Sequence, residues 1–350
     1  MKILAMDLGK SKSVACVYEG AHAGREADPR FETIASTPAE VLKLLERERP
    51  GRVVIEIGPT AGWVCDLCRG RGVEVQVANT NAEAWHWKRV KRKSDRDDAL
   101  KLARLSALGQ LPTVHMPEPR VRAWRELIRY RHTLVGRRTR IKNSLRAVLQ
   151  RQAIDWPAGP AGFSKGALEE LAAMAAGGSE SWRLTLGPEL AQLRQVGEAI
   201  AQVERELDTL AAADDRVALL RTIPGVGPRL AETIVAVIDD PRRFRSGKEV
   251  GCYAGLTPRR WQSGGTDRHG RISGQGHDLL RSLLVEVAWL GRQYNPWMKA
   301  VYERALRGSP SRKKIAITAL ARRLLVVCWA MLRNATPWRE SAAAKLGLAA

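Results

Sequence analysis

Short apolar runs alternate with polar, turn-forming segments along the first 80 residues. Apolar runs at 2–9, 13–20 and 31–37 predict three strands, and β-branched runs predict two more at 52–58 and 73–79. Apolar residues at helical spacing predict helices at 38–47 and 62–70. A third helix is predicted at 94–109, with Ser94 as its N-cap and acidic residues in its first turn. This order predicts an α/β domain over residues 1–110.

The remaining chain is patterned as helices. Residues 111–215 are polar and helical, with a stretch at 158–178 that is rich in small residues and expected to be partly loose. Apolar residues at spacings of three and four form a seam from Leu193 to Leu210. The seam indicates either a short coiled coil or an amphipathic helix packed on the protein's own core. Residues 216–350 form a third, mostly helical segment, so the predicted fold class is α/β plus α.

The excess of basic residues indicates a negatively charged partner. The chain carries 58 Lys and Arg against 37 Asp and Glu, a net charge of +21. Nineteen basic and five acidic residues lie between Lys88 and Arg151, a net charge of +14. Trp124 and Tyr130 lie within this stretch, and Trp85 and Trp87 directly precede it. Such a stretch favours nucleic acid as the partner, because cations neutralise phosphates and aromatic rings stack on unpaired bases. The basic residues expected to contact nucleic acid here are Lys91, Arg92, Lys93, Arg137, Arg138, Arg140 and Lys142.

The cysteines and the apolar runs bear on the compartment. The N-terminus does not read as a signal peptide, and the longest apolar run, at 324–332, is far shorter than a membrane span. The five cysteines are scattered. Cys65 and Cys68 form a lone CxxC that is expected to be buried on a helix rather than to bind zinc. The sequence therefore predicts a cytoplasmic protein with no membrane partner.

Acidic residues within this basic chain suggest a metal site. Asp7 ends the first predicted strand, Glu56 lies within an apolar strand, and Asp95 and Asp98 share one face of a helix start. Carboxylates gathered at one end of a sheet favour Mg²⁺ or Mn²⁺, which would hold a scissile phosphate. Asp97 is an alternative to either member of the helical pair. Turn formation by Asp7 and helix-dipole interactions of Asp95 and Asp98 are competing explanations.

These motifs resemble a known family. Asp-x-Gly after the first strand, a glutamate on a strand and Asp-x-x-Asp on a later helix resemble the DEDD site of RuvC-like nucleases with a ribonuclease H fold. The segments IEIGPTAG and KSDRDDALKLA, at 55–62 and 93–103, resemble the DEDD transposases of the insertion-sequence 110 family, kin of the Piv DNA invertases. The resemblance covers nearly the whole chain. It implies a RuvC-like domain at 1–110, a helical and coiled-coil region at 111–215 and a C-terminal transposase domain at 216–350.

Two motifs of the third segment carry chemistry of their own. The Pro-Gly-Val-Gly turn with Gly225 and Gly227 lies between apolar helices, which is typical of a helix-hairpin-helix that contacts a nucleic-acid backbone. The segment 254–276 is polar, rich in glycine and basic, and is expected to be an exposed loop. Arg259, Arg260 and Arg268 in it are further candidates for phosphate contacts. In the resembling family a serine in the AGLTPRR-x-x-S-G context is the proposed nucleophile. Ser263 holds that position, and Ser273 competes with it.

The resemblance implies a transposase that cuts and rejoins DNA strands. Asp7, Glu56, Asp95, Asp98 and Ser263 would be catalytic, with the four acids as ligands of Mg²⁺ or Mn²⁺. The implied partners are donor and target DNA, a bridge RNA that guides the choice of DNA, and further copies of the chain in a dimer or tetramer. Two alternatives remain open. The same acids would serve a hydrolytic RuvC-like junction nuclease that uses water as nucleophile, or the chain would be a non-enzymatic nucleic-acid-binding protein.

Overall fold

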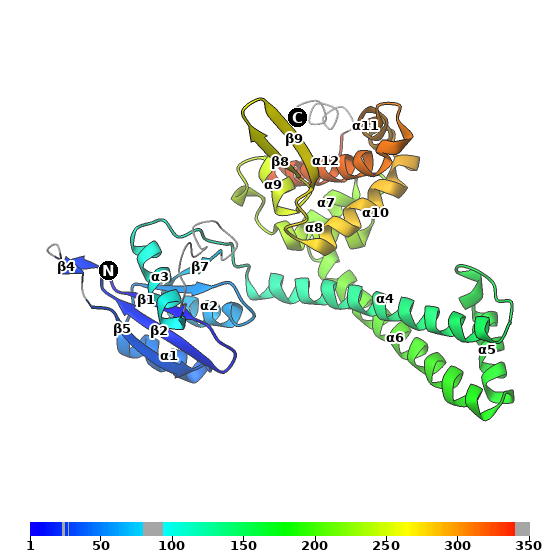
Figure 1. Ribbon diagram of the computed structural model, residues 1–350, viewed down its shortest axis with the longest axis horizontal. Coiled ribbons are helices and arrows are strands. Elements are labelled where there is room, and N and C mark those ends of the chain that lie inside the picture. The colour runs from blue at the N-terminus through cyan, green and yellow to red at the C-terminus, as the bar shows by residue number, and fades with distance from the viewer. Residues whose placement is uncertain (23–24, 27, 80–93, 340–350) are drawn as a thin grey trace. The chain divides into compact units, whose positions relative to one another are not determined.

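The computed structural model describes residues 1–22, 25–26, 28–79 and 94–339 (Figure 1). These residues form two compact units, Met1–Pro119 and Arg120–Ala350. The predicted fold class is confirmed, because a mixed α/β domain precedes a mostly helical remainder. The division into segments at 110 and 215 stays a prediction.

Unit 1 is built on one mixed sheet of five strands. β1 (Ile3–Asp7), β2 (Lys12–Tyr18) and β5 (Arg30–Ala35) are antiparallel neighbours, whereas β6 (Arg52–Glu56) and β7 (Glu74–Ala78) run parallel to β1. The strand order is β5-β2-β1-β6-β7. A separate two-stranded ribbon pairs β3 (Ala21–His22) with β4 (Arg25–Glu26).

Helices cover both faces of this sheet. α1 (Pro38–Glu48) and α2 (Ala61–Gly70) bury their apolar sides against one face, and α3 (Asp95–Ala107) covers the other. The predicted strands and helices of this unit are all present. Cys65 and Cys68 are fully buried on α2, and burial raises the pKa of the Cys68 thiol to about 12, so the pair belongs to the core.

Unit 2 combines a helical arm with a helical core. In the arm, the 33-residue helices α4 (Pro119–Arg151) and α6 (Glu180–Ala212) lie side by side, and α5 (Lys165–Gly177) packs at their far end (Figure 1). The stretch at 158–178, expected to be partly loose, is therefore largely helical. The core contains α7 (Asp215–Arg221), α8 (Pro228–Ile238), α9 (Gly247–Tyr253), α10 (Asp278–Tyr294), α11 (Pro296–Leu306) and α12 (Lys313–Asn334).

The seam of α6 is used inside the chain. Ile200 and Leu207 are buried with Ile128 of α4, and Leu193 is buried with Leu145 of α4 nearer the far end of the arm. The helices run in opposite directions, because Arg131 bonds to Glu204 whereas Ser144 bonds to Glu189. The seam thus packs in an intramolecular antiparallel pairing with α4.

One helix of the core is long and apolar. Residues 310–334 are long and apolar enough to cross a membrane by length and composition, yet 61% of the most apolar window is buried inside the molecule. α12 packs against α9, α10 and α11 within the main apolar core of unit 2. This burial is typical of the central helix of a helical domain.

Candidate functional site

Asp7 and Glu56 end two neighbouring parallel strands. Met6 of β1 is opposite Ile55 of β6, so Asp7 and Glu56 occupy the next position along each strand. Neighbouring strands lie about 4.8 Å apart, which brings the two backbones close together at this end of the sheet. Both side chains are half-buried.

The two carboxylates project from the same face of the sheet. Side chains alternate between faces along a strand, so Asp7 shares the face of Ala5, and Glu56 shares that of Val54. Ala5 and Val54 are buried in the cluster formed with Leu102 of α3. Asp7 and Glu56 therefore project toward the α3 side of the sheet.

The direction of α3 brings Asp98 to the same end. Arg52, at the start of β6, donates a hydrogen bond of 3.3 Å to Ser106 in the last turn of α3, so the helix runs antiparallel to the strand. Asp98 precedes Ser106 by eight residues, which is about 12 Å along a helix that rises 1.5 Å per residue. Glu56 follows Arg52 by four residues, which is about 13 Å along a strand that rises 3.3 Å per residue. Measured from the contact between Arg52 and Ser106, Asp98 and Glu56 therefore lie at about the same distance, at the same end of the sheet.

The three aspartates of α3 have different surroundings. Asp97 accepts hydrogen bonds from the Ser94 backbone N–H at 3.1 Å and from its Oγ at 2.6 Å, completing a capping box. Asp98 is only 5% exposed and lies on the sheet side of the helix, whereas Asp95 is exposed at the first helical position. The cap accounts for Asp97 and leaves Asp95 and Asp98 as the pair that the family motif favours.

The donor set suits an oxygen-preferring ion, although it is not a closed ligand shell. Asp7, Glu56, Asp95 and Asp98 offer carboxylate oxygens alone, which are the ligands that Mg²⁺ and Mn²⁺ prefer. Within the described ranges, no three Asp, Glu, His or Cys side chains converge closely enough to hold a metal ion. The structure thus brings the acids to one end of the sheet without closing them around an ion.

Ser263 lies at the tip of a β-hairpin, where a loop was expected. β8 (Pro258–Ser263) and β9 (Thr266–Ile272) are antiparallel, and a two-residue turn at Gly264–Gly265 joins them, with Gly264 at φ 54°. Ser263 pairs with Thr266 beside the turn and is exposed. The expectation of a flexible loop is wrong, because the Gly-Gly turn lets exposed polar residues pair as strands.

Side chains stiffen the hairpin. Arg260 and Asp267 are joined across the strands by two hydrogen bonds of 2.8 Å. The ring of Trp261 covers Gly270 so closely that a Cβ at Gly270 would lie 2.4 Å from it. This pairing holds the strand that presents Ser263.

The competing Ser273 lies at the opposite end of the hairpin. Its backbone N–H donates to the Thr257 carbonyl at 2.8 Å, and its own carbonyl accepts from Arg259 at 3.3 Å. About six residues of strand, roughly 20 Å, separate this base from the tip. The tip position of Ser263 is the more accessible of the two for a phosphate.

The Pro-Gly-Val-Gly turn connects α7 to α8 at the surface. Gly225 has a φ of +94°, which favours glycine. A Cβ at Gly225 would lie 3.3 Å from the Cα atom of Gly291 on α10. Gly227 is the N-cap of α8, and both glycines are exposed. Asn295, 2% exposed, donates to the Pro224 carbonyl at 3.0 Å and fixes the turn on α10 and α11.

The basic residues of α4 separate into two groups. Arg125 donates to the carbonyls of Ala236 and Val237 at the end of α8, and Arg131 forms an ion pair of 2.6 Å with Glu204. These two side chains stabilise the fold. Four of the predicted contacts, Arg137, Arg138, Arg140 and Lys142, form no ion pair with any residue that the structure describes.

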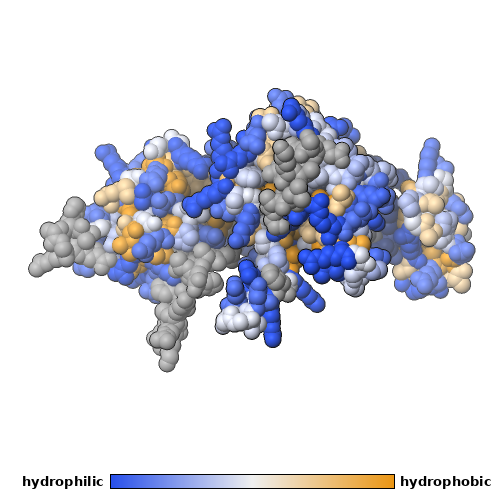
Figure 2. Space-filling view, turned by 90° about the horizontal axis from the view of Figure 1, so that it is seen from above, coloured by the Kyte–Doolittle hydropathy of each residue, from blue (hydrophilic) through white to orange (hydrophobic). Residues whose placement is uncertain are grey.

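The remaining predictions for the basic stretch have mixed outcomes. Lys91, Arg92, Lys93, Trp85 and Trp87 lie outside the described residues. Trp124 is 3% exposed in the core and is not available to stack on bases, whereas Tyr130 is 46% exposed. Hydrophilic residues cover most of the face drawn in Figure 2.

Two family models match separate parts of the chain. The model of the IS110 DEDD transposases, described as a transposase, matches residues 4–153, and the model of the IS116/IS110/IS902 transposase family matches residues 217–303. Together they span more than half of the chain.

Curated relatives agree with these models. The transposase for insertion sequence element IS1111A of Coxiella burnetii is 26% identical over 97% of this chain and 92% of its own length. The transposase for insertion sequence element IS1328 of Yersinia enterocolitica is 28% identical over 70% of this chain and 74% of its own length. The pilin gene-inverting protein of Moraxella lacunata is 32% identical over 42% of this chain and 47% of its own length.

Among solved structures, RuvC of Thermus thermophilus is similar, with 20% identity and a TM-score of 0.25, over 33% of this chain and all of RuvC.

The family models cover the segment that carries the acids and the segment that carries Ser263, and the IS1111A transposase aligns with both over nearly its full length. The chain belongs to the IS110 family of transposases.

Proposed function

We propose that this transposase cuts and rejoins the DNA of a mobile element through Ser263, with Asp7, Glu56, Asp95 and Asp98 as the acids that hold divalent metal. The observation that carries the proposal is the gathering of Asp7, Glu56 and Asp98 at one end of the sheet. Asp98 is buried there, although the chain as a whole is strongly basic. Carboxylate oxygens gathered at one end of a sheet are the ligands that divalent metal ions such as Mg²⁺ prefer.

The chemistry is an exchange of phosphodiester bonds. Mg²⁺ or Mn²⁺ bound by the acids would polarise the scissile phosphate and offset its charge. The Ser263 Oγ attacks the phosphorus, a bridging P–O bond to one DNA oxygen breaks, and the serine proton ends on that departing oxygen. A second DNA hydroxyl then attacks the phosphoserine, so the bond is remade and Ser263 regains its proton. No oxidant or nucleotide cofactor is required.

The hairpin supports the role of Ser263. The serine is exposed beside a tight turn, and Arg259, Arg260 and Arg268 lie on the same two strands. Arginines beside an attacked phosphate stabilise its developing charge. The acids lie in unit 1 and Ser263 lies in unit 2, so both units must act on one phosphate, from one chain or from two copies.

The test is to trap the covalent intermediate on end-labelled DNA that carries the element's own termini. Wild-type protein with Mg²⁺ should form a protein–DNA adduct that survives denaturation. Ser263→Ala should lose the adduct and strand exchange, whereas Ser273→Ala, the matched control, should keep both. Full cleavage by Ser263→Ala would leave the hydrolytic junction nuclease, with water as nucleophile, as the better account.

The acids have a test of their own. Chelation of divalent metal with EDTA should abolish the adduct, and Mg²⁺ or Mn²⁺ should restore it. Asp7→Asn and Glu56→Gln should abolish cleavage while DNA binding persists. Retained strand exchange in both variants would remove the acids from the mechanism and would favour a role confined to binding.

A guide RNA and an oligomer complete the proposal. The family resemblance implies a bridge RNA, and the cations of α4 that lack carboxylate partners, together with the turn at Gly225 and Gly227, suit backbone contacts as in a helix-hairpin-helix. Sequencing of the nucleic acid that copurifies with the protein should yield one discrete RNA from the flank of its gene. Light scattering of the complex with DNA should give a dimer or a tetramer.

A further inference from the structure

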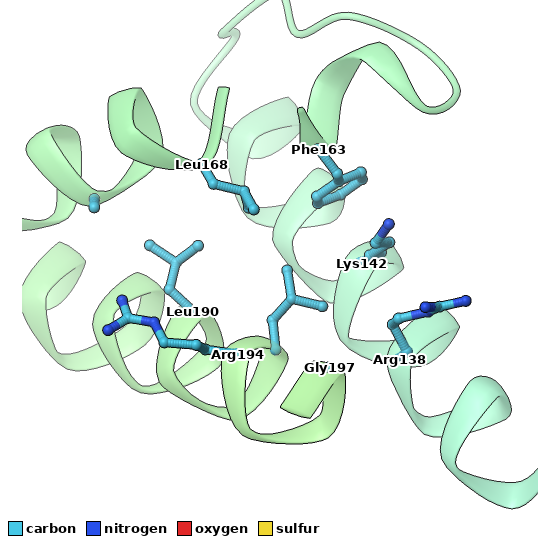
Figure 3. A pocket seen from close by; sticks show the side chains of 9 residues that line it. Arg138, Lys142, Phe163, Leu168, Leu190, Arg194 and Gly197 are labelled. Carbon is cyan, nitrogen blue, oxygen red and sulfur yellow. The ribbon is translucent and has the colours of Figure 1, made fainter. Parts of the chain in front are cut away.

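A cleft in the helical arm is lined by cations and leucines. It has a volume of about 280 Å³ and lies between α4, α5 and α6, well away from the acids and from Ser263 along the chain. Figure 3 shows Arg138 and Lys142 of α4 on one side of the cleft and Arg194 of α6 on the other, with leucines between them and the two guanidinium groups pointing away from each other. The lining consists of Arg138, Lys142, Phe163, Leu168, Ala172, Leu190, Leu193, Arg194 and Gly197.

The register of the arm explains why the cleft exists. Arg131 of α4 is paired with Glu204 of α6. Because the helices are antiparallel, a step of seven residues forward on α4 and seven back on α6 sets Arg138 opposite Gly197. Glu204 places a carboxylate opposite Arg131, whereas Gly197 places only a hydrogen atom opposite Arg138. The missing side chain opens the cleft and leaves Arg138 without a carboxylate across the seam.

The cations around the cleft have no acidic partner. Among the residues that the structure describes, Arg138, Lys142 and Arg194 form no ion pair, and no Asp or Glu lines the cleft. The Lys142 ammonium lies 4.6 Å from the centre of the Phe163 ring. Burial and the neighbouring Arg138 and Arg146 lower the pKa of Lys142. An anion at the rim would relieve this accumulation of positive charge.

The floor of the cleft favours more than a bare phosphate. Leu190 and Leu193 are buried beneath it, and Leu168 and Phe163 form its wall. Apolar walls with a few charged groups at the rim are typical of sites for a flat organic group that carries a charge. A nucleobase joined to its phosphate has this character. A base within a duplex is stacked and cannot enter a pocket, so the ligand must be unpaired.

We propose that this cleft binds one unpaired nucleotide of a nucleic-acid strand, with the base against the leucines and the phosphate beside Arg138 and Lys142 on the α4 side of the rim. The inference rests on the proposed nucleic-acid function and specifies a part of it. RNA and DNA offer the same chemistry here, because each has unpaired bases and a phosphate backbone. The site holds a strand and takes no part in bond breaking.

Gly197→Leu tests the cleft without a change in charge. A Cβ at Gly197 meets no atom within 4 Å, and leucine favours a helix more than glycine does, so the variant should fold. Gly136→Leu is the matched control, since Gly136 is exposed on α4, has the same open space and does not line the cleft. Thermal unfolding of both variants should match or exceed that of the wild type.

The probes are a 20-nucleotide single strand with one central 2-aminopurine, as DNA and as RNA, and the DNA duplex of the same sequence. Binding of the full chain should change the 2-aminopurine fluorescence of a single strand. Gly197→Leu should weaken single-strand binding at least tenfold and abolish that change, while duplex affinity stays within twofold. Gly136→Leu should behave as the wild type. Whichever single strand, DNA or RNA, the wild-type protein binds more tightly identifies the source of the nucleotide.

Two results would overturn the inference. One is wild-type affinity of Gly197→Leu for both single strands, and the other is an equal loss of single-strand and duplex binding. Neither result touches the covalent adduct of Ser263, which is measured on duplex DNA termini. Conversely, loss of the Ser263 mechanism with a Gly197→Leu effect intact would leave the cleft standing.

Discussion

Glu232 is a buried carboxylate whose replacement should stabilise the protein at neutral and alkaline pH. Its side chain on α8 is 1% exposed, with Oε1 3.1 Å from Arg229 Nη1. Its Oε2 atom has no hydrogen-bond partner within the described part of the chain. Burial raises the pKa of Glu232 to about 7, although Arg229 and Arg131 oppose the change. Glu232→Gln keeps the shape of the side chain and removes its charge.

The magnitude follows from the difference between the two pKa values. The folded value of about 7 exceeds the ordinary value of 4.5, and each pKa unit corresponds to 1.36 kcal/mol. The folded state therefore holds the proton more tightly, and the contribution of Glu232 to stability is greatest below pH 4.5. It falls by about 3 kcal/mol as the pH rises from 4.5 through 7 and is constant above. The variant should exceed the wild type by about 1–3 kcal/mol at pH 8, since it also loses the pair with Arg229.

A second buried group changes in the opposite direction. His277, the N-cap of α10, accepts a hydrogen bond from the Leu280 N–H, and burial lowers its pKa to about 4 from 6.5. Its contribution to stability is present above pH 6.5 and is lost as the pH falls toward 4. The two effects offset each other between about pH 4.5 and 6.5. The wild-type pH profile is therefore uninformative, and the difference between the wild type and Glu232→Gln is the quantity to measure.

The assay is urea unfolding at pH 5 and pH 8, followed by tryptophan fluorescence. Eight of the 11 tryptophans lie in the second unit, which contains Glu232. The stability gain of Glu232→Gln should be at least 1 kcal/mol larger at pH 8 than at pH 5. Glu206→Gln, an exposed control on α6, should show no such difference. An equal effect of Glu232→Gln at both pH values, or destabilisation at pH 8, would refute the reasoning.

Three further changes test the acids, the hairpin and the turn. Asp97→Ala should cost about 1 kcal/mol of stability through the lost cap of α3, as measured by thermal unfolding, and should keep strand cleavage, whereas Asp98→Asn should abolish cleavage. Gly270→Val should displace the Trp261 ring and abolish adduct formation in the trapping assay, with the affinity for DNA reduced less than threefold. Asn295→Leu should cost about 2–4 kcal/mol in urea unfolding, because α11 loses its cap and the Pro224 carbonyl of the glycine turn loses the donor that the buried Asn295 supplies.

Much of the first unit could be predicted because its signals are local. Continuous apolar runs mark β1 and β6, and Ser94 caps α3 as expected from its side chain. The acids could be placed at one end of the sheet for the same reason, since strand order and helix direction follow from these elements. The closeness of their side chains could not be predicted, because it depends on rotamers that no pattern in the sequence reports.

The hairpin was missed because its strands are not apolar. Every residue of β8 is exposed, so no alternation with a buried face distinguishes it from a loop. Its stability depends on contacts between the strands, such as Arg260 with Asp267 and Trp261 over Gly270. Such pairs become visible only once the register is known. The Gly-Gly dipeptide was the one local signal, and it is compatible with both a turn and a flexible loop.

The partner of the α6 seam was hidden for a different reason. A heptad pattern identifies the buried face of a helix, not the surface that covers it. α4 covers it, yet Arg131 and Arg138 occupy seam positions and dilute the apolar stripe of α4. The cleft could not be predicted either, because Gly197, Phe163 and Arg194 share no motif in the sequence. Their association exists only in the folded arm.

Whether a basic residue of α4 stabilises the fold or is left for a ligand depends on the hydrogen-bond acceptors near it. Toward the core of unit 2, Arg125 donates hydrogen bonds to the carbonyls that end α8, and Arg131 pairs with Glu204, so both cations have partners within the fold. Beyond Arg131, α4 continues with cations, but its partner helix offers Gly197 in place of an acid. The helix pairing is kept there by leucines, and the charge is left for a ligand. The fold itself therefore determines that the far part of the arm, rather than the whole basic helix, is where nucleic acid is to be expected.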